Sequence, residues 1–377
     1  MKNWKRSTKR LIVTTLCFSG VGLLVMTLLP VLLRCWYDYT FVQITEKNEK
    51  LFEQKLLAGT LKLMEDKTLA NNIMYWDTPI NFLKNGILSF KTISVYDYGE
   101  YGLMLYYLNR YAELKKDSNL ISNIYEIVDK DILKGDTLFD VKRPDQLMYG
   151  SILIDCYKKT NSVKYKKAID KLMSYARKRV NEYGVLAYKD GGFQQVEALS
   201  FGPFLKECAT TFGDTIAFQI RDNLFEDYWE YGINHRNGIP VKGYDLKSKI
   251  ASKSADWGRG VSWLIVGDFE APDDKCIVKM DSTLLSIGPL YTQYLGDPRS
   301  VPDMSVTIPI LYYLYSKGLI SFSKREFIRI LSPYIDEDGV VRYNSPSYAM
   351  PNEKPNAHHF AHFTQSIALY LYAILKD

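Results

Sequence analysis

The chain has 377 residues, enough for one large domain or two small ones. Six of its 48 basic residues and none of its 43 acidic residues fall within residues 1–34, so the remaining chain is balanced, with 42 basic against 43 acidic side chains. This balance excludes the basic excess of nucleic-acid-binding proteins. The five cysteines form neither a disulfide framework nor a zinc pattern, and Cys156 and Cys208 lie in apolar runs that predict core thiols. No cofactor is indicated.

The N-terminus consists of a basic tail over residues 1–10 and an uncharged apolar run over residues 11–33. Such a run is long enough to span a bilayer, exceeds the apolar region of a signal peptide and lacks a small-residue cleavage site. Because the basic cluster precedes it, the positive-inside rule keeps the N-terminus in the cytoplasm. The sequence therefore predicts a single-pass protein of the inner (plasma) membrane, anchored in the bilayer, with residues 41–377 as one extracytoplasmic domain.

Beyond this segment, apolar residues recur at helical spacing, without a convincing series of strands. Several helices are predicted to start with an acidic or amide residue followed by a turn of small and apolar residues; these starts are Asp97, Asp145, Glu197, Asp256, Asp303 and Asn356. Successive starts lie 48, 52, 59, 47 and 53 residues apart. More polar helices are expected between them, for example over residues 163–181, 214–232 and 323–334. A period near fifty with two helices per unit is typical of an α-hairpin repeat.

One further helix, over residues 46–64, precedes the first of these starts. It would pair with the last inner helix, over residues 360–375, and so close a ring. Twelve helices in a closed double ring form an all-α fold, the six-hairpin α/α toroid. Closure explains why neither end carries the polar capping repeat that an open solenoid would need.

In such a ring the inner helices run parallel, and their N-termini gather on one face with unpaired N–H groups and a partial positive charge. Asp and Asn are good N-caps, so we expect structural roles for Asp97, Asp303 and Asn356. Glu is a poor N-cap, and Glu197 therefore needs another explanation. Together with Asp145 it would provide the pair of carboxylates on which glycoside cleavage depends.

Residues 257–263 read Trp-Gly-Arg-Gly-Val-Ser-Trp. Two indoles and a guanidinium placed around two glycines suit the face of a sugar ring and its carboxylate. The alternative is a buried aromatic turn with a structural arginine.

From about residue 140 to residue 266, the chain resembles the unsaturated glucuronyl and rhamnogalacturonyl hydrolases. The resemblance rests on the motif at 257–263, on the acid followed by Pro-Phe-Leu within 196–205, and on Pro-Asp-Gln-Leu at 144–147. It implies a six-hairpin toroid that acts on unsaturated uronic acids at the ends of chains cut by polysaccharide lyases.

The resemblance also implies roles for individual residues. Glu197 would protonate the ring double bond and activate water, and Asp145 would be its partner. Trp257, Arg259 and Trp263 would hold the uronate, because the planar fork of an arginine matches a carboxylate.

Two positions depart from the family pattern. The family has Asp where Glu197 stands, and the extra methylene displaces the carboxylate. In the segment 238–245, Lys242 stands in place of a histidine that contacts substrate; it can bind an anionic sugar but cannot act as a neutral imidazole. Tyr244 of the same segment and His358, before the last inner helix, complete the predicted substrate-binding residues.

His358, His359 and His362 also raise the possibility of a metal site, since residues four apart share a helix face. No carboxylate is spaced with them. We therefore expect them to line the mouth of the toroid or to contact sugar, with no metal.

Two classes of function remain open. The first is a membrane-anchored hydrolase that acts on an acidic polysaccharide through Glu197. The second is a catalytically silent toroid that binds nascent polysaccharide or partner proteins of an assembly machine. An anchored toroid fits work on a polymer during synthesis or export, as in exopolysaccharide and capsule synthesis proteins, although a fold alone does not fix a function.

Overall fold

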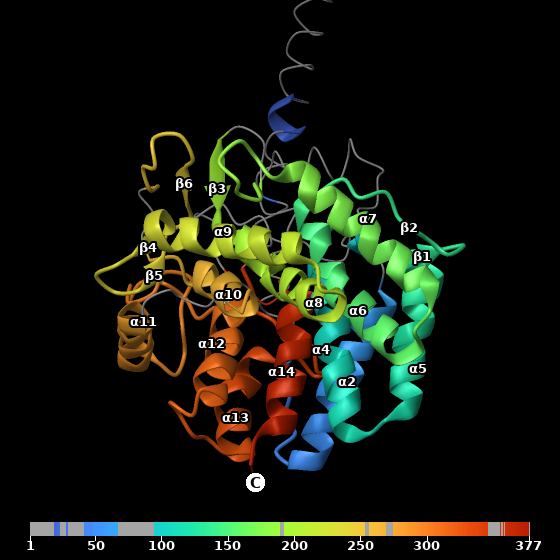
Figure 1. Cartoon of the computed structure of the whole chain (residues 1–377). Helices are drawn as coiled ribbons and strands as arrows, with labels where there is room; N and C mark the ends of the chain where they lie inside the picture. Colours follow the sequence, from blue (N-terminus) through green and yellow to red (C-terminus); the bar gives the residue numbers. More distant parts are fainter. Residues whose placement is uncertain are drawn as a thin grey trace, which may run out of the picture.

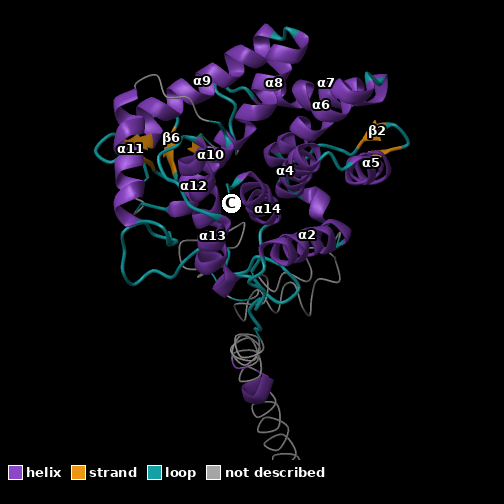
Figure 2. Ribbon diagram, turned by 90° about the horizontal axis from the view of Figure 1, so that it is seen from below, coloured by secondary structure: helices purple, strands orange, loops and turns teal. Residues whose placement is uncertain are grey.

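The computed structural model describes residues 19–22, 28, 41–66, 94–188, 192–252, 256–268, 274–345, 355, 357 and 359–376. Within them, helices of eight or more residues form two concentric rings (Figure 2). The inner ring consists of α4 (Glu100–Lys115), α6 (Tyr149–Thr160), α8 (Gly202–Phe212), α10 (Gly258–Val266), α12 (Met304–Ser316) and α14 (His362–Ile374). The outer ring consists of α2 (Glu49–Glu65), α5 (Ser118–Ile127), α7 (Val163–Arg179), α9 (Thr215–Gly232), α11 (Asp274–Ile287) and α13 (Lys324–Leu331).

The ring closes where the last inner helix meets the first. Helix α14 packs against α4, and also against α2, the first outer helix (Figure 1). Buried Gln365 of α14 donates hydrogen bonds to the carbonyl of Leu56 and the hydroxyl of Thr60, both at 3.2 Å, and the Tyr372 hydroxyl donates to the carbonyl of Glu49 at 2.9 Å. The six-hairpin α/α toroid, with α2 paired to the last helix, is confirmed.

The inner helices begin close to the predicted residues. Asp303 is the N-cap of α12, and its fully buried carboxylate accepts hydrogen bonds from the amides of Ser305 at 2.9 Å and Ser345 at 3.0 Å. Its structural role is therefore as expected. Asp97 ends the 3-10 turn η4 (Val95–Asp97), three residues before α4, whereas Asn356 lies outside the described residues.

Asp145 and Glu197 do not occupy the first turn of an α-helix. Each lies in a 3-10 turn that leads into one: η6 (Pro144–Met148) precedes α6, and η7 (Val196–Phe201) precedes α8. These two turns contact each other, which brings the two carboxylate-bearing segments together at one end of the inner ring.

Short strands join the hairpins at this end. The described pairs are β1 (Leu133–Lys134) with β2 (Thr137–Leu138), β3 (Phe193–Gln195) with β6 (Gly243–Asp245), and β4 (Ile233–Asn234) with β5 (Ile239–Pro240), all antiparallel. Two or three residues are too few to produce an alternating apolar pattern in the sequence. Cys156 and Cys208 are buried free thiols, as predicted.

Most of the predicted membrane anchor, residues 11–33, lies outside the described residues. Across the part of the chain that the structure describes, no helix combines the length and the apolar character needed to cross a bilayer.

Candidate functional site

The β3–β6 ladder brings Glu197 next to Lys242. Its last pair joins Gln195 to Gly243, and the next backbone bond runs from the amide of Val196 to the carbonyl of Lys242 at 3.0 Å. A Cβ atom on Gly243 would lie 2.1 Å from the carbonyl oxygen of Gln194, so this close approach requires glycine. The ladder therefore fixes two residues that are 45 positions apart in sequence on the same edge of the toroid.

Lys242 lies between a carboxylate and an indole. Its ammonium nitrogen is 3.8 Å from Oε1 of Glu197 and 4.3 Å from the centroid of the Trp257 ring. Trp257 is the N-cap of α10 and is 5% exposed. Three of the predicted site residues, from three separate segments, thus meet at the N-terminal end of the inner ring.

Asp145 is held by Arg143 in a two-pronged ion pair. Nε and Nη2 of Arg143 donate to the two carboxylate oxygens at 3.0 and 3.2 Å, and the guanidinium lies 4.5 Å above the Tyr98 ring. Burial raises the pKa of Asp145 above its ordinary value, although Arg143 acts to lower it. The side chain of Gln146 accepts from the amides of Lys142 and Arg143 and so anchors the start of η6.

Tyr188 lies close to both carboxylates. Burial raises the pKa of its phenol well above the ordinary range, and the charges of Asp145 and Glu197 raise it further. Buried Gln194 fixes this segment, since it accepts from the amide of Tyr188 at 3.2 Å and donates to the carbonyl of Leu186 at 2.9 Å. At neutral pH the phenol keeps its proton and can donate a hydrogen bond to an anion or a hydroxyl.

Comparison with known proteins identifies the family. The sequence matches the model of Glycosyl Hydrolase Family 88 over residues 77–271, slightly more than half of the chain. The chain belongs to glycosyl hydrolase family 88. No match was found among curated proteins.

Solved structures share the fold of this family 88 protein. A possible family 105 glycoside hydrolase from Salmonella enterica serovar Paratyphi A superposes with a TM-score of 0.69 at 14% identity, over 87% of this chain and 93% of that one. A family 105 hydrolase from Clostridium acetobutylicum superposes with a TM-score of 0.62 at 18% identity, over 83% of this chain and 99% of that one. The unsaturated glucuronyl hydrolase of Bacillus sp. GL1 superposes with a TM-score of 0.54 at 14% identity, over 85% of this chain and 96% of that one.

Arg259 of this family 88 protein points into the interior. It is 1% exposed, and its Nη2 lies 2.6 Å from Oε1 of Glu100. Its Nη1 donates to the carbonyl of Ser345, and its guanidinium lies 5.3 Å from the ring of Phe363. The predicted role in holding a uronate does not fit this geometry; the alternative interpretation, a structural arginine in a buried aromatic turn, does.

Trp263 and Tyr244 are also interior residues rather than parts of a sugar-binding surface. Trp263 is 4% exposed and packs on Phe363 with ring centroids 5.1 Å apart. Tyr244 is fully buried behind the β3–β6 ladder, where its hydroxyl donates to Asp227. Trp257 and Trp263 are buried to a similar extent, and their neighbours distinguish them: Lys242 lies over Trp257, whereas Phe363 packs on Trp263.

The three histidines lie at and just before the start of α14, His362–Ile374. His358 lies outside the described residues, so its role stays a prediction. His359 and His362 are buried, and the ring of His362 packs edge-on against Tyr101 and Phe360. These two residues form part of the packed interior and do not line an open mouth.

Three residues that contact the predicted site residues were not predicted from the sequence: Arg143, Tyr188 and Glu100. Arg143 had an available signal, since an arginine two positions before a buried aspartate can neutralise it. Glu100 lies 159 positions from Arg259, and the chain offers no local indication of that pairing.

Proposed function

We propose that this protein cleaves a terminal unsaturated uronic acid from an acidic oligosaccharide at the N-terminal end of its inner ring. The observation that carries the proposal is the meeting of Glu197, Lys242 and Trp257 beside the Asp145–Arg143 pair. The arrangement provides carboxylates for proton transfer and cations for the uronate, and the buried indole of Trp257 supports the ammonium of Lys242. The similar Bacillus protein is named as an unsaturated glucuronyl hydrolase.

In the proposed reaction, Glu197 donates its proton to one carbon of the ring double bond and takes a proton from water. The water oxygen forms a bond to the other carbon of the double bond. The resulting hemiketal opens by breaking its bond to the ring oxygen, which gives a ketone and leaves a hemiacetal at the glycosidic carbon. This hemiacetal collapses to an aldehyde, and the glycosidic oxygen leaves as an alcohol that carries the hemiacetal proton. Bond breaking thus follows hydration and needs no direct displacement at the glycosidic carbon.

Lys242 and Asp145 have separate tasks in this scheme. The side chain of Lys242 is 28% exposed, and its ammonium neutralises the uronate carboxylate. Asp145, held in one orientation by Arg143, accepts a hydrogen bond from a sugar hydroxyl near the reacting carbons. The Tyr188 phenol keeps its proton and donates to the same region.

The test is turnover by the full chain in detergent with unsaturated glucuronyl disaccharides, measured as loss of the ultraviolet absorbance of the double bond. We expect Glu197→Gln to abolish turnover. Glu197→Asp restores the family's residue and should keep or increase it. Glu226→Gln, at an exposed site on outer helix α9, is the matched control and should behave as the wild type.

One observation favours a second candidate, a toroid that binds acidic polysaccharide without cleaving it. Both oxygens of Asp145 accept hydrogen bonds from Arg143, and Lys242 lies close to Glu197, so each carboxylate already has a cationic neighbour. Under this candidate, the wild type would bind saturated and unsaturated acidic oligosaccharides equally well and turn over neither.

We further propose that residues 11–33 anchor the domain to the outer face of the inner membrane, where it processes exopolysaccharide or capsule during export. Support comes from the uncharged run and from the basic residues before it. Protease added to intact spheroplasts should degrade the domain. In intact inverted vesicles the domain should resist the same protease. The opposite pattern would refute the orientation.

A further inference from the structure

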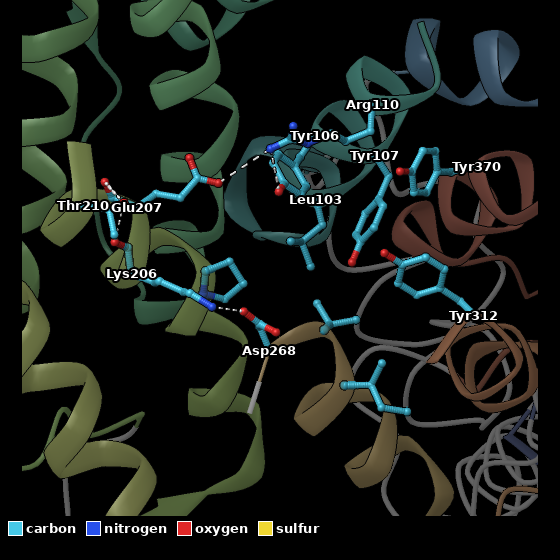
Figure 3. A pocket seen from close by; sticks show the side chains of 13 residues that line it. Leu103, Tyr106, Tyr107, Arg110, Lys206, Glu207, Thr210, Asp268, Tyr312 and Tyr370 are labelled. Atoms are coloured by element: carbon cyan, nitrogen blue, oxygen red, sulfur yellow. Dashed lines mark hydrogen bonds and ion pairs between the residues drawn. The ribbon is translucent and has the colours of Figure 1, made fainter. Parts of the chain in front are cut away.

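The inner ring contains a cavity whose lining includes neither Asp145 nor Glu197. Its volume is about 340 Å³, and it is lined by side chains from α4, α8, α10, α12 and α14 (Figure 3). It lies toward the C-terminal ends of α10, α12 and α14, since Ile265, Val266, Tyr312 and Tyr370 all come from the C-terminal halves of these helices. We call it the distal cavity.

A buried ion pair separates the distal cavity from the proposed catalytic end. Glu100 lies one turn before the cavity-lining Leu103 on α4, and Arg259 lies about two turns before Val266 on α10. Their pairing crosses the lumen between helices on opposite sides of the inner ring. Glu197 is not among the residues that line the distal cavity.

Three tyrosines form the aromatic side of the distal cavity. The ring centroids of Tyr107, Tyr312 and Tyr370 lie 6.0 to 6.2 Å apart in each pairing. The hydroxyls of Tyr107 and Tyr312 point toward the same space (Figure 3). Within the described residues, the Tyr107 hydroxyl has no hydrogen-bond partner, and burial raises its pKa well above the ordinary range, so it remains a donor that a ligand can use.

Charged side chains form the opposite side, and they balance one another. Lys206 pairs with Asp268 at 2.7 Å, and Arg110 lies 3.9 Å from Glu207. The C-terminus of α10, whose dipole end is negative, also faces the cavity and disfavours an anion. A uronate is therefore a poor ligand here, whereas sugar hydroxyls can both donate to the carboxylates and accept from the cations.

We propose that the distal cavity binds a neutral saccharide. The tyrosine rings pack against the C–H face of the sugar, the Tyr107 hydroxyl donates to one ring oxygen or hydroxyl, and the Lys206–Asp268 pair engages adjacent hydroxyls. Pockets that combine aromatic walls with a few convergent polar groups are the usual form of small-molecule sites. The site would hold a neutral sugar of the same polymer, or its reducing end, apart from the acidic unit at the catalytic end.

The test uses the full chain in detergent and saturation-transfer NMR with glucose, galactose, rhamnose, maltose and galacturonic acid as probes. We expect at least one neutral sugar to bind and galacturonic acid to bind the cavity more weakly. Tyr107→Phe keeps the ring and removes the hydroxyl, and should weaken neutral-sugar binding about fivefold. Tyr313→Phe is the matched control: its hydroxyl, on the same helix as Tyr312, donates to Asp281 outside the cavity, and binding should be unchanged.

Glu197→Gln distinguishes this site from the catalytic end and should leave neutral-sugar binding intact, whether or not turnover is found. The proposal is overturned if no neutral probe binds, if Glu197→Gln abolishes the binding, or if galacturonic acid competes equally. Should Tyr107→Phe fail to fold, Lys206→Gln, at a side chain that is 43% exposed, serves instead with the same expectation.

Discussion

Arg259 of α10 and Glu100 of α4 form an ion pair at 2.6 Å across the lumen of the inner ring. Ser305 of α12 and the rings of Trp263 and Phe363 surround the same guanidinium. Helices from most of the ring thus share one charged residue. The arginine of the Trp-Gly-Arg-Gly motif thus links helices of the inner ring through contacts inside the protein.

Removal of one partner from this pair should destabilise the fold. Arg259→Leu leaves the Glu100 carboxylate buried without its cation, and we expect the free energy of unfolding to fall by about 3–5 kcal/mol. Urea unfolding of the full chain in detergent provides the measurement. The double variant Glu100→Leu/Arg259→Leu removes both charges and should recover part of the loss. If Arg259→Leu is as stable as the wild type and has lost only uronate binding, Arg259 belongs to the substrate site and not to the interior.

Arg143 should set the acid limb of the pH–rate profile. Burial raises the pKa of Asp145 and Arg143 acts to lower it, so Arg143→Gln raises that pKa further. Because the ionised carboxylate exists above its pKa, activity that needs it should disappear at a higher pH in the variant than in the wild type. The profile of kcat/KM against pH is the measurement.

Arg299→Gln is the control for this experiment, since Arg299 is 88% exposed at the side chain and pairs only locally with Asp297. Its profile should match that of the wild type. Identical acid limbs for Arg143→Gln and the wild type would show that the ionisation of Asp145 does not limit the reaction.

Features that depend on neighbours in sequence could be predicted for this chain. Cap residues, small-residue turns and helical spacing are local, and they located the six inner helices and their ring. The paired elements were different. Lys242 meets Glu197 through a ladder of three residues per strand, and Glu100 meets Arg259 from 159 positions away. Such contacts depend on how distant segments of the chain meet, and no local pattern gives their partners.

The neighbours of each motif residue also depend on the whole fold, because Trp257 and Trp263 are buried to a similar extent. Both tryptophans belong to one motif, yet Trp257 lies against Lys242 beside Glu197 and Trp263 packs on Phe363. Trp257 is the extended N-cap of α10 and Trp263 lies within that helix, so their side chains leave the backbone in different directions. A resemblance in sequence assigned both to the sugar, because it carries residue type and spacing without orientation.

Lys242 should contribute to uronate binding. Lys242→Met keeps the stem that packs near Trp257 and removes the charge, and we expect about tenfold weaker binding of an unsaturated glucuronyl disaccharide. Lys247→Met, on the exposed turn after β6, removes an equal charge at a distance and should have little effect. Equal losses in both variants would indicate long-range attraction and not a specific contact. The measurement is calorimetric titration. Both variants are made in the Glu197→Gln background, which is expected to prevent turnover during the titration.

His362 should make the fold sensitive to acid. Burial lowers its pKa from the ordinary 6.5 to about 4 in the folded protein, although the charge of Asp66 opposes this. The unfolded chain therefore binds a proton on this residue first as the pH falls. The stability that neutral His362 provides is complete above about pH 6.5 and is lost progressively down to about pH 4, a loss of about 3 kcal/mol.

Comparison of His362→Phe with the wild type isolates this contribution, because phenylalanine fits between the same aromatic rings and cannot titrate. The difference between the free energies of unfolding near neutral pH and near the folded pKa should be smaller in the variant by about the same 3 kcal/mol. Replacement of the exposed His235 with Phe should leave the wild-type dependence in place. Parallel curves for wild type and His362→Phe would mean that the folded protein protonates His362 as readily as the unfolded chain does.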